Sequence, residues 1–570
     1  MSTHARPLAD WLAAARDDDL LRLLTARGVR PDAGWQDFFD AAESLLDPAS
    51  LARVLPSLTA SEAGALLDAA SGRGAGSEQE QLTALALLRP DGTPYPPVVT
   101  AIAGRTAPAP PQGPTTISSS SESASAHAAE RAFTTVAVLA DLLLVTRERP
   151  FALLIGGGVS AGEKRQLSES GVPVEIVDTL LALAIQAGLA AAADRRLRST
   201  QPAEEWLRAS AVDRWSVLAT SFRDALPRGV RSSDGGWIAP EQWTFAHPWD
   251  PAWPDRARTI HEAARLLGLI AEDGTEPEWA TGLREGGAPD TAALARLLPT
   301  EVDRIFLQND LTAIAPGPLE PALDVRLRAI ATRESAAQAS SYRFTSESVA
   351  HAFVAGETER SILDLLGAIS LTGIPQPLSY LIAQTAQRHG LVRVSTDEET
   401  GRTRIESSDP HLISAMAVDQ SLRPLALTAH VESLTTRVSR ETVYWALTDA
   451  RYPATLVGPD GALLVRERHP APPVVPASSD SPDLAALITR LRSHQGPDAD
   501  AAWLDRELEA AVRAKSVLQV TVGMPDGSTR ELLLEATGMG GGRLRGRDRA
   551  ADVERTLPVS SILAATIVAP

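Results

Sequence analysis

The hydrophobic and polar positions of the chain predict helices over most of its first part and strands near its C-terminal side. In LADWLAAARDDDLLRLLTARG, apolar residues recur with the three- and four-residue spacing of an amphipathic helix, and residues 8–104 continue in this way. Further helices are predicted at 484–495 and 499–514, and a β-rich segment follows them. We therefore expect a predominantly helical protein that also contains sheets.

Two stretches interrupt this pattern. Residues 105–130 are rich in Pro, Ser and Ala and contain almost no large apolar side chain, and residues 466–483, RERHPAPPVVPASSDSPD, are similar. Such segments cannot bury enough surface to offset the entropy of ordering their backbone. We predict flexible linkers at both places.

One local pattern occurs three times, at 180–200, 261–280 and 380–407. In each, an apolar helix ends at a Gly-Leu pair, and an extended stretch with turn residues follows. A glycine in the left-handed conformation caps a helix, and the chain can then leave as a strand, turn and return. This order is the second half of a winged helix; the alternative is an ordinary connection between a helix and a hairpin.

Composition narrows the choice of partners. The formal net charge of the 570 residues is -18, which argues against coating nucleic acid by bulk charge but leaves room for a local basic patch. Lysine occurs only at Lys164 and Lys515, so anion contacts are expected to use arginine. The absence of cysteine excludes disulfides and cysteine metal sites. With no apolar run of membrane-spanning length, we expect a cytoplasmic protein, for which association with the nucleoid is an option.

No enzyme motif is found in the sequence. FALLIGGGVSAGEKRQ, residues 151–166, resembles a phosphate-binding loop, but Glu163 stands where the lysine is needed and Lys164 comes one position late. GMGGGRL, residues 538–544, precedes a strand pattern and not the helix that would hold a pyrophosphate. Histidines lack metal-ligand spacing, so no catalytic residue, cofactor or metal is expected.

The first basic group lies at the hairpin predicted for 180–200. Arg195, Arg196 and Arg198 occupy its turn and returning strand, where arginines can reach a nucleic-acid backbone. The alternative is a solvated hairpin tip without a partner.

The second basic group is GRLRGRDRA. Arg543, Arg545, Arg547 and Arg549 alternate with other residues, and this spacing places them on one face of a strand. Like charges on one face repel each other unless an anion or an acidic partner lies opposite. A turn beginning near Asp548 would leave fewer arginines on that face. The alternatives are therefore an anion-binding strand and a solvated outer face.

Tryptophan is unevenly distributed, because seven of the 11 lie between Trp206 and Trp279. Such clustering is typical of a local aromatic core or a domain interface, and base stacking is the alternative.

Three blocks carry a family resemblance: IFLQNDLTAIAPGPLEPAL, YRFTSESVAHAFVAGETERSILDLL and IPQPLSYLIAQTAQRHGLVRV. In this order and spacing they resemble the N-terminal domain of XPB/Ssl2-type helicases, as found in bacterial helicase-associated domain proteins, and the likeness extends to about residue 465. Residues 149–207 resemble the winged-helix region of the same proteins. The resemblance implies DNA transactions near an XPB-type helicase, without the ATPase motor, whose lysine and acidic motifs are not in this sequence.

The C-terminal stretch, residues 516–567, resembles a WYL-type small β-barrel, although it contains no Trp-Tyr-Leu triplet. The resemblance implies an SH3-like β-barrel, and the missing triplet weakens the implication of ligand sensing.

We therefore expect a multi-domain α+β protein that is predominantly α-helical, with winged-helix modules, an XPB-N-terminal-like α/β domain and a small C-terminal barrel. The leading hypothesis is a non-catalytic helicase-associated protein that binds DNA or docks an XPB-type helicase in DNA repair or transcription. A protein-interaction scaffold without DNA binding and a WYL-type transcription regulator are the alternatives. The predicted segments are a helical or winged-helix domain at 1–104, a linker at 105–130, tandem winged helices at 131–302, the XPB-like domain at 303–465, a linker at 466–483, and helices plus the WYL-like domain at 484–570.

Overall fold

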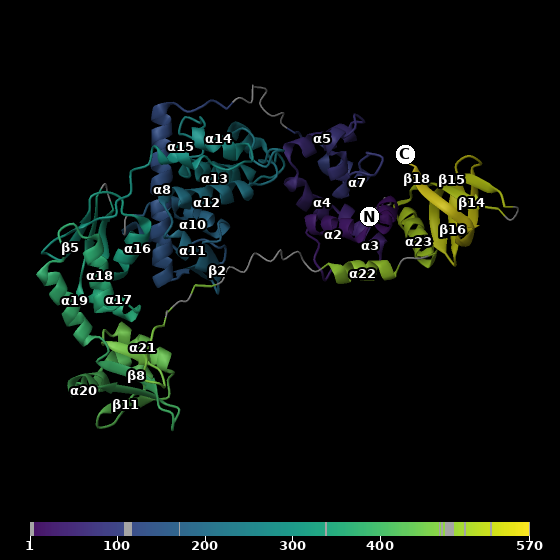
Figure 1. Cartoon of the computed structure of the whole chain (residues 1–570). Helices are drawn as coiled ribbons and strands as arrows, with labels where there is room; N and C mark the ends of the chain where they lie inside the picture. The colour runs from purple at the N-terminus through teal and green to yellow at the C-terminus, as the bar shows by residue number, and fades with distance from the viewer. Residues whose placement is uncertain are drawn as a thin grey trace.

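The computed structural model of the chain shows a mixed α/β protein in which roughly half of the residues are helical (Figure 1). It describes residues 5–107, 117–169, 172–336, 339–466, 468, 471–472, 484–494, 497–524 and 527–568. The strands of this described part form four sheets, and its buried apolar residues form five clusters. This agrees with the expected multi-domain α+β class. None of the described helices is both long and apolar enough to cross a membrane.

The N-terminal region is a group of short helices whose core is completed by residues from the other end of the chain. Leu487 and Leu491 of α22 (Ala485–Ser493) and Trp503 of α23 (Pro497–Ala514) belong to the same apolar cluster as the first helices. Figure 1 shows α22 beside these helices. The helices are α1 (Ala5–Ala14), α2 (Asp17–Ala26), α3 (Phe38–Leu46), α4 (Pro48–Val54), η1 (Leu55–Ser57), α5 (Ala60–Ala70), η2 (Gly76–Glu78), α6 (Gln79–Ala84) and α7 (Pro96–Ile102).

The next region is built around the long helix α8 (Glu122–Glu148). After it the chain forms a strand, two helices and two further strands, and the three strands pair in the order β1-β3-β2, all antiparallel. Five more helices and one 3-10 helix pack around this core. The elements are β1 (Phe151–Ala152), α9 (Ala161–Glu169), α10 (Val174–Gln186), β2 (Ala190–Ala193), β3 (Arg196–Ser199), α11 (Gln201–Trp206), α12 (Ala211–Asp224), η3 (Pro240–Phe245), α13 (Trp253–Leu266), α14 (Glu278–Arg284) and α15 (Thr291–Ala295).

The linker predicted at 105–130 is too long, because α8 already begins at Glu122. Ser121 caps the helix by accepting a hydrogen bond from the backbone N–H of Ala124. Ala128 is fully buried, and its carbonyl lies so close to Gly268 that a Cβ there would come within 2.4 Å of the carbonyl oxygen. A core can form here without large apolar side chains, because the small alanines allow the backbone of α8 to approach that of Gly268 closely. Residues 108–116, in the same predicted linker, lie outside the described part, as does most of 466–483.

The tryptophan cluster forms a core and an interface, as predicted. Trp215, Trp243, Trp253 and Trp279 are almost fully buried. Trp249 belongs instead to the apolar cluster of the N-terminal helices, and its Nε1 donates to the carbonyl of Thr106 at 3.0 Å. These aromatic side chains are therefore used for packing and are not available for base stacking.

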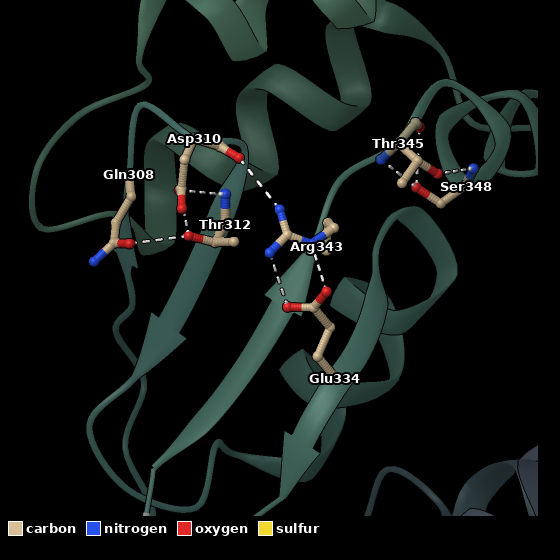
Figure 2. Close-up of polar contacts among 7 residues, drawn as sticks. All are labelled: Gln308, Asp310, Thr312, Glu334, Arg343, Thr345 and Ser348. Atoms are coloured by element: carbon tan, nitrogen blue, oxygen red, sulfur yellow. Dashed lines mark hydrogen bonds and ion pairs between the residues drawn. The ribbon is translucent and has the colours of Figure 1, made fainter. Parts of the chain in front are cut away.

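The segment that begins at Asp303 opens with a short hairpin (Figure 2). The turn between its strands contains Asn309, Asp310 and Leu311, the last with a left-handed φ of 67°. The Asp310 carboxylate accepts hydrogen bonds from the hydroxyl and the backbone N–H of Thr312, and the hydroxyl contact holds the pKa of Asp310 below its ordinary value. Thr345 caps the following helix in a reciprocal pair with Ser348. The Asp310 contacts hold the turn in place.

Two sheets follow one another in this half of the chain. The first has the order β4-β5-β7-β6 and packs on four helices. The second has the order β10-β11-β9-β8-β12-β13 with one parallel pair, β8 and β12. The elements are β4 (Phe306–Leu307), β5 (Thr312–Ala315), α16 (Pro321–Ile330), β6 (Thr332–Ala336), β7 (Ser340–Arg343), α17 (Ser346–Val354), α18 (Glu359–Ile369), α19 (Gln376–Arg388), β8 (Val392–Thr396), β9 (Thr403–Ser407), α20 (Pro410–Val418), η4 (Gln420–Leu425), β10 (Thr428–Ala429), β11 (Ser433–Thr436), α21 (Arg440–Asp449), β12 (Ala454–Val457) and β13 (Leu463–Leu464).

Of the three predicted hairpins, the first and the third are present. The first joins β2 to β3, and the third joins β8 to β9, where it is part of the six-stranded sheet. The second, at 261–280, is wrong. Gly268 does adopt the left-handed conformation after α13, but Glu276 then pairs with Ser119, and no returning strand forms. The intervening AEDGTEP lacks the alternating apolar residues that would hold a second strand on the core.

The C-terminal sheet has the order β17-β16-β15-β14-β18, and every neighbouring pair is antiparallel. Leu504, Leu508 and Ala511 of α23 belong to its apolar cluster, so this helix covers one face. Closure into an SH3-like barrel stays a prediction. The elements are β14 (Val517–Gly523), β15 (Thr529–Gly540), β16 (Arg543–Asp548), β17 (Val553–Pro558), η5 (Val559–Ser561) and β18 (Ile562–Val568).

Candidate nucleic-acid interface

The hairpin of β2 and β3 presents the first group of predicted arginines. Ala193 pairs with Arg196, which leaves Asp194 and Arg195 as a two-residue turn, both with a left-handed φ near the values of a type I′ turn. Arg195 and Arg196 are exposed, and Arg198 is half-buried. The hairpin therefore holds two arginines in solvent at the end of an ordered sheet.

The surroundings of these arginines contain small neutral residues. Arg196 lies between Ala193 and Ala152 in the sheet, and Arg198 lies opposite Ala191. Within the described residues, none of the three arginines forms an ion pair, and the Nε of Arg198 is buried without a hydrogen-bond acceptor. Their charge is therefore available to an anion.

The glycine-rich segment before α9 does not form a phosphate site. Glu163, in the position of the expected lysine, pairs with Arg149 at 2.8 Å, and Lys164 contacts Asp178 at 2.5 Å. A carboxylate at the first turn of α9 would repel the phosphate that such a loop binds.

The second group of predicted arginines lies on β16 in the C-terminal sheet. Exposed and buried residues alternate along the strand, so Arg543, Arg545 and Arg547 share its exposed face as expected. Arg549 lies beyond the end of the strand. The buried Asp548 ends the strand by accepting from the backbone N–H of Ala550 at 3.0 Å and from Arg555 Nε at 2.6 Å.

The four arginines of this group differ in their partners. Arg547 pairs with Asp552 at 2.6 Å, and Arg549 approaches Glu535 at 3.6 Å. Arg543 and Arg545 form no ion pair among the described residues. Their neighbours on β15 are Gly540 and Gly538, and those on β17 are Pro558 and Thr556. The two arginines thus stand on an open part of the sheet, where no carboxylate competes for them.

A helix that sequence reasoning passed over offers a third surface. One side of α19 is buried through Leu378, Ile382 and Thr385, and the other exposes polar residues. Tyr380 is 67 % exposed. The exposed residues with hydrogen-bonding side chains are Gln376, Tyr380, Gln384, Gln387 and Arg388.

The helix α19 contains no acidic residue, a feature that it shares with α20 and α22. Glutamine and arginine side chains are the ones that contact the edges of adenine and guanine. The sequence contains this signal as Gln and Tyr at helical spacing without a carboxylate.

The structure does not bring these surfaces together. The hairpin of β2 and β3, the helix α19 and the strand β16 belong to different sheets and clusters. In Figure 1 the labels of β2 and β16 lie far apart, with the N-terminal helices between them in this view. A single ligand that contacts all three would have to be long.

Comparison with known families identifies a similarity in the second half of the chain. Residues 305–430 match the family described as helicase conserved C-terminal domain. The matched segment runs from the start of the four-stranded sheet to β10 and includes α19. No curated protein matches the chain. The chain therefore contains a segment similar to a helicase C-terminal domain, which supports the resemblance at the level of a helicase-associated protein.

Proposed function

We propose that the protein is a non-catalytic, helicase-associated protein that binds DNA through its exposed arginines and docks an XPB-type helicase. The observation that carries this proposal is the pair Arg543 and Arg545, which stand exposed on β16 without a carboxylate partner among the described residues. The helicase-like segment at 305–430 gives the nucleic-acid context.

The region around α8 supports DNA binding through its order of elements. The region contains a helix, a strand, two helices and two strands, with the sheet order β1-β3-β2, which supports the predicted winged helix. In that arrangement α10 would be the helix for the major groove. Its exposed side carries Glu175 and Asp178 and neither lysine nor arginine, so phosphates would repel it. We therefore assign the DNA contact of this region to the hairpin of β2 and β3 and its arginines.

Phosphate contacts and base contacts are divided between surfaces in this proposal. The arginines of the hairpin and of β16 bind the backbone, which positions DNA without reading its sequence. The exposed side of α19 reads base edges through Gln384, Gln387 and Arg388. The WYL-like sheet then serves as a binding face and not as a ligand sensor, since it lacks the Trp-Tyr-Leu triplet.

The proposal that the protein is non-catalytic is based on its sequence. The sequence contains no Walker A lysine at the required spacing. In FALLIGGGVSAGEKRQ, the stretch most similar to a Walker A loop, Glu163 occupies the position of that lysine. An ATPase motor would have to come from a partner, which is why we include the docking of an XPB-type helicase to the 303–465 region.

A second function is favoured by charge. The net charge of -18 and the acidic side of α10 suit a protein-interaction scaffold that does not touch DNA.

Fluorescence anisotropy separates the two functions. The full chain is titrated into labelled duplex and single-stranded DNA at low salt and at physiological salt. We expect binding that weakens steeply with salt, because phosphate contacts release counterions. Absence of binding to both DNAs at low salt would overturn the DNA-binding proposal. Capture of an XPB-type helicase by the same protein would then support the scaffold.

A further inference from the structure

The turn that follows β1 places two large apolar side chains in solvent. Ile155 is 94 % exposed and Leu154 is 54 % exposed. Three glycines follow them, and the space where a Cβ would stand at each is empty. Ile155 therefore extends almost entirely into solvent, whereas other isoleucines nearby, such as Ile176, pack against the core.

This turn is an ordered hairpin. Leu153 and Val159 form a bridge at its base and are both buried. The backbone N–H of Leu154 donates to the carbonyl of Gly158 at 2.8 Å, and that of Gly157 donates to the carbonyl of Leu154 at 3.0 Å. The backbone of the turn is therefore ordered, and its apolar tip lies away from the core.

The same turn is joined to the arginine hairpin. Ala152 pairs with Arg196, and the backbone N–H of Leu153 donates to the carbonyl of Arg195 at 2.9 Å. The tip thus projects from the edge of the sheet next to two exposed arginines. The charged side chains at this end of the sheet are Asp194, Arg195, Arg196 and Arg198, which give a local excess of positive charge in an acidic protein.

An apolar tip beside arginines that lack ion-pair partners fits an occupant that is both anionic and apolar. Duplex DNA has this character, because phosphates border a stack of apolar base faces. Proteins that bend DNA insert leucine or isoleucine between base pairs while arginines hold the backbone. The helicase-like segment favours DNA over an anionic lipid surface, which shares the same chemistry.

We propose that Leu154 and Ile155 form an apolar wedge that enters between base pairs while Arg195 and Arg196 bind the adjacent phosphates. This inference rests on the proposed DNA binding and adds that the bound duplex is unstacked. The wedge favours pyrimidine–purine steps, which separate most easily.

The test uses a duplex with 2-aminopurine in successive TA steps, since the fluorescence of this base rises when it leaves the stack. Wild-type full chain is expected to bind, by anisotropy, and to raise the fluorescence. The double variant Leu154→Ser, Ile155→Ser is expected to bind within about threefold of wild type, because the arginine contacts remain, and to lose the rise. The double variant Arg195→Ala, Arg196→Ala is expected to bind more weakly.

Val418→Ser is the matched control, because Val418 is 79 % exposed at the end of α20, far along the chain from the tip. It is expected to behave as wild type. Circular dichroism checks that each variant is folded.

The outcomes distinguish the wedge from the proposed function. Wild-type binding without a rise, or a rise that persists in the Leu154→Ser, Ile155→Ser variant, overturns the wedge and leaves DNA binding intact. Absence of binding overturns both. Pelleting with phosphatidylserine–phosphatidylcholine vesicles that depends on Ile155, without a rise on DNA, assigns the tip to a lipid surface instead.

Discussion

Asp141 of α8 accepts a hydrogen bond from the guanidinium of Arg328 of α16, with 2.6 Å between Oδ1 and Nη1. Its other oxygen accepts from Arg333 of β6. The two arginine side chains are only 18 % exposed. One carboxylate of the α8 region therefore balances two arginines of the helicase-like segment where the two regions meet.

Asp141→Ala is expected to destabilise this junction, because Arg333 loses its carboxylate partner and Arg328 keeps only the more distant Asp324, at 3.7 Å. The cost is about 2 kcal/mol, below the value for a fully buried pair because the carboxylate is one quarter exposed. Urea unfolding measured by tryptophan fluorescence should show a lower midpoint. Asp364→Ala is the control, since the Asp364–Arg360 pair lies on the surface and should change the midpoint little. Equal midpoints for the two variants would contradict the role given to Asp141.

The arginines of β16 should divide into two pairs in their effect on DNA binding. Replacing Arg543 and Arg545 with alanine is expected to weaken binding and to lower the slope of log K against log salt by about 2, because each phosphate contact contributes about 0.9. Replacing Arg547 and Arg549, which already have acidic partners, should change the slope less. Anisotropy titrations of both double variants at several salt concentrations measure this, and identical slopes would refute the assignment.

The exposed side of α19 should affect sequence preference more than overall affinity. With Gln384→Ala and Arg388→Ala combined, we expect the spread of affinities over a random duplex library to narrow, because base-edge hydrogen bonds are lost. Arg388→Ala removes one charge. The slope of log K against log salt should therefore change by no more than about 0.9, the contribution of one phosphate contact. Selection from the library followed by sequencing gives the spread. An unchanged preference would mean that α19 does not read bases.

His247 should make the contact between the N-terminal helices and the tryptophan-rich region sensitive to acid. Its ring is buried against Trp253, and its Nδ1 lies 3.0 Å from the carbonyl of Leu58. Burial lowers the pKa of His247 below its ordinary value near 6.5. The unfolded chain therefore binds a proton below about pH 6.5 that the folded chain does not, and stability falls as the pH is lowered through that range.

His247→Gln should remove part of this pH dependence. The unfolding midpoint of wild type should fall more than that of the variant between about pH 7.5 and 5.5. His389, whose pKa is also lowered by burial, is present in both proteins, so the difference between the curves reports His247 alone. Parallel curves would show that this histidine does not titrate with unfolding.

Leu487→Ala should loosen α22 from the N-terminal helices. Leu487 is fully buried, and truncating such a leucine costs about 2–4 kcal/mol. Hydrogen exchange followed by mass spectrometry should show faster exchange in both α22 and α2, which contact each other. Thr489→Ala, on the exposed side of the same helix, should leave the exchange of α2 unchanged. Faster exchange in α22 alone would mean that the helix does not stabilise its neighbours.

Local features of the fold were predictable because neighbouring residues determine them. The spacing of Arg543, Arg545 and Arg547 was enough to place them on one face, and Thr345 and Pro377 lie at the helix starts that their chemistry favours. The helical start of α8 differs from the predicted linker, because small alanine side chains suffice for a core where two backbones approach closely. At Gly268 a close approach of two backbones makes small residues the favourable ones.

Features that depend on distant parts of the chain could not be read from periodicity. The pattern at 484–495 predicts a helix but does not say that it packs on residues 5–102. The ion pairs of Arg547 and Arg549 depend on where the strand ends and how the next one returns. The exposure of Ile155 is not predictable from the pattern, because an apolar residue beside a strand is ordinarily assigned to the core.

The packing of α22 on the first helices has a consequence for synthesis. Residues 5–102 are translated long before Leu487 and Leu491, which complete their core. The nascent N-terminal helices therefore carry an uncovered apolar face until α22 has been translated, the state in which chains are prone to aggregate and to bind chaperones. A chain truncated before α22 keeps that face uncovered.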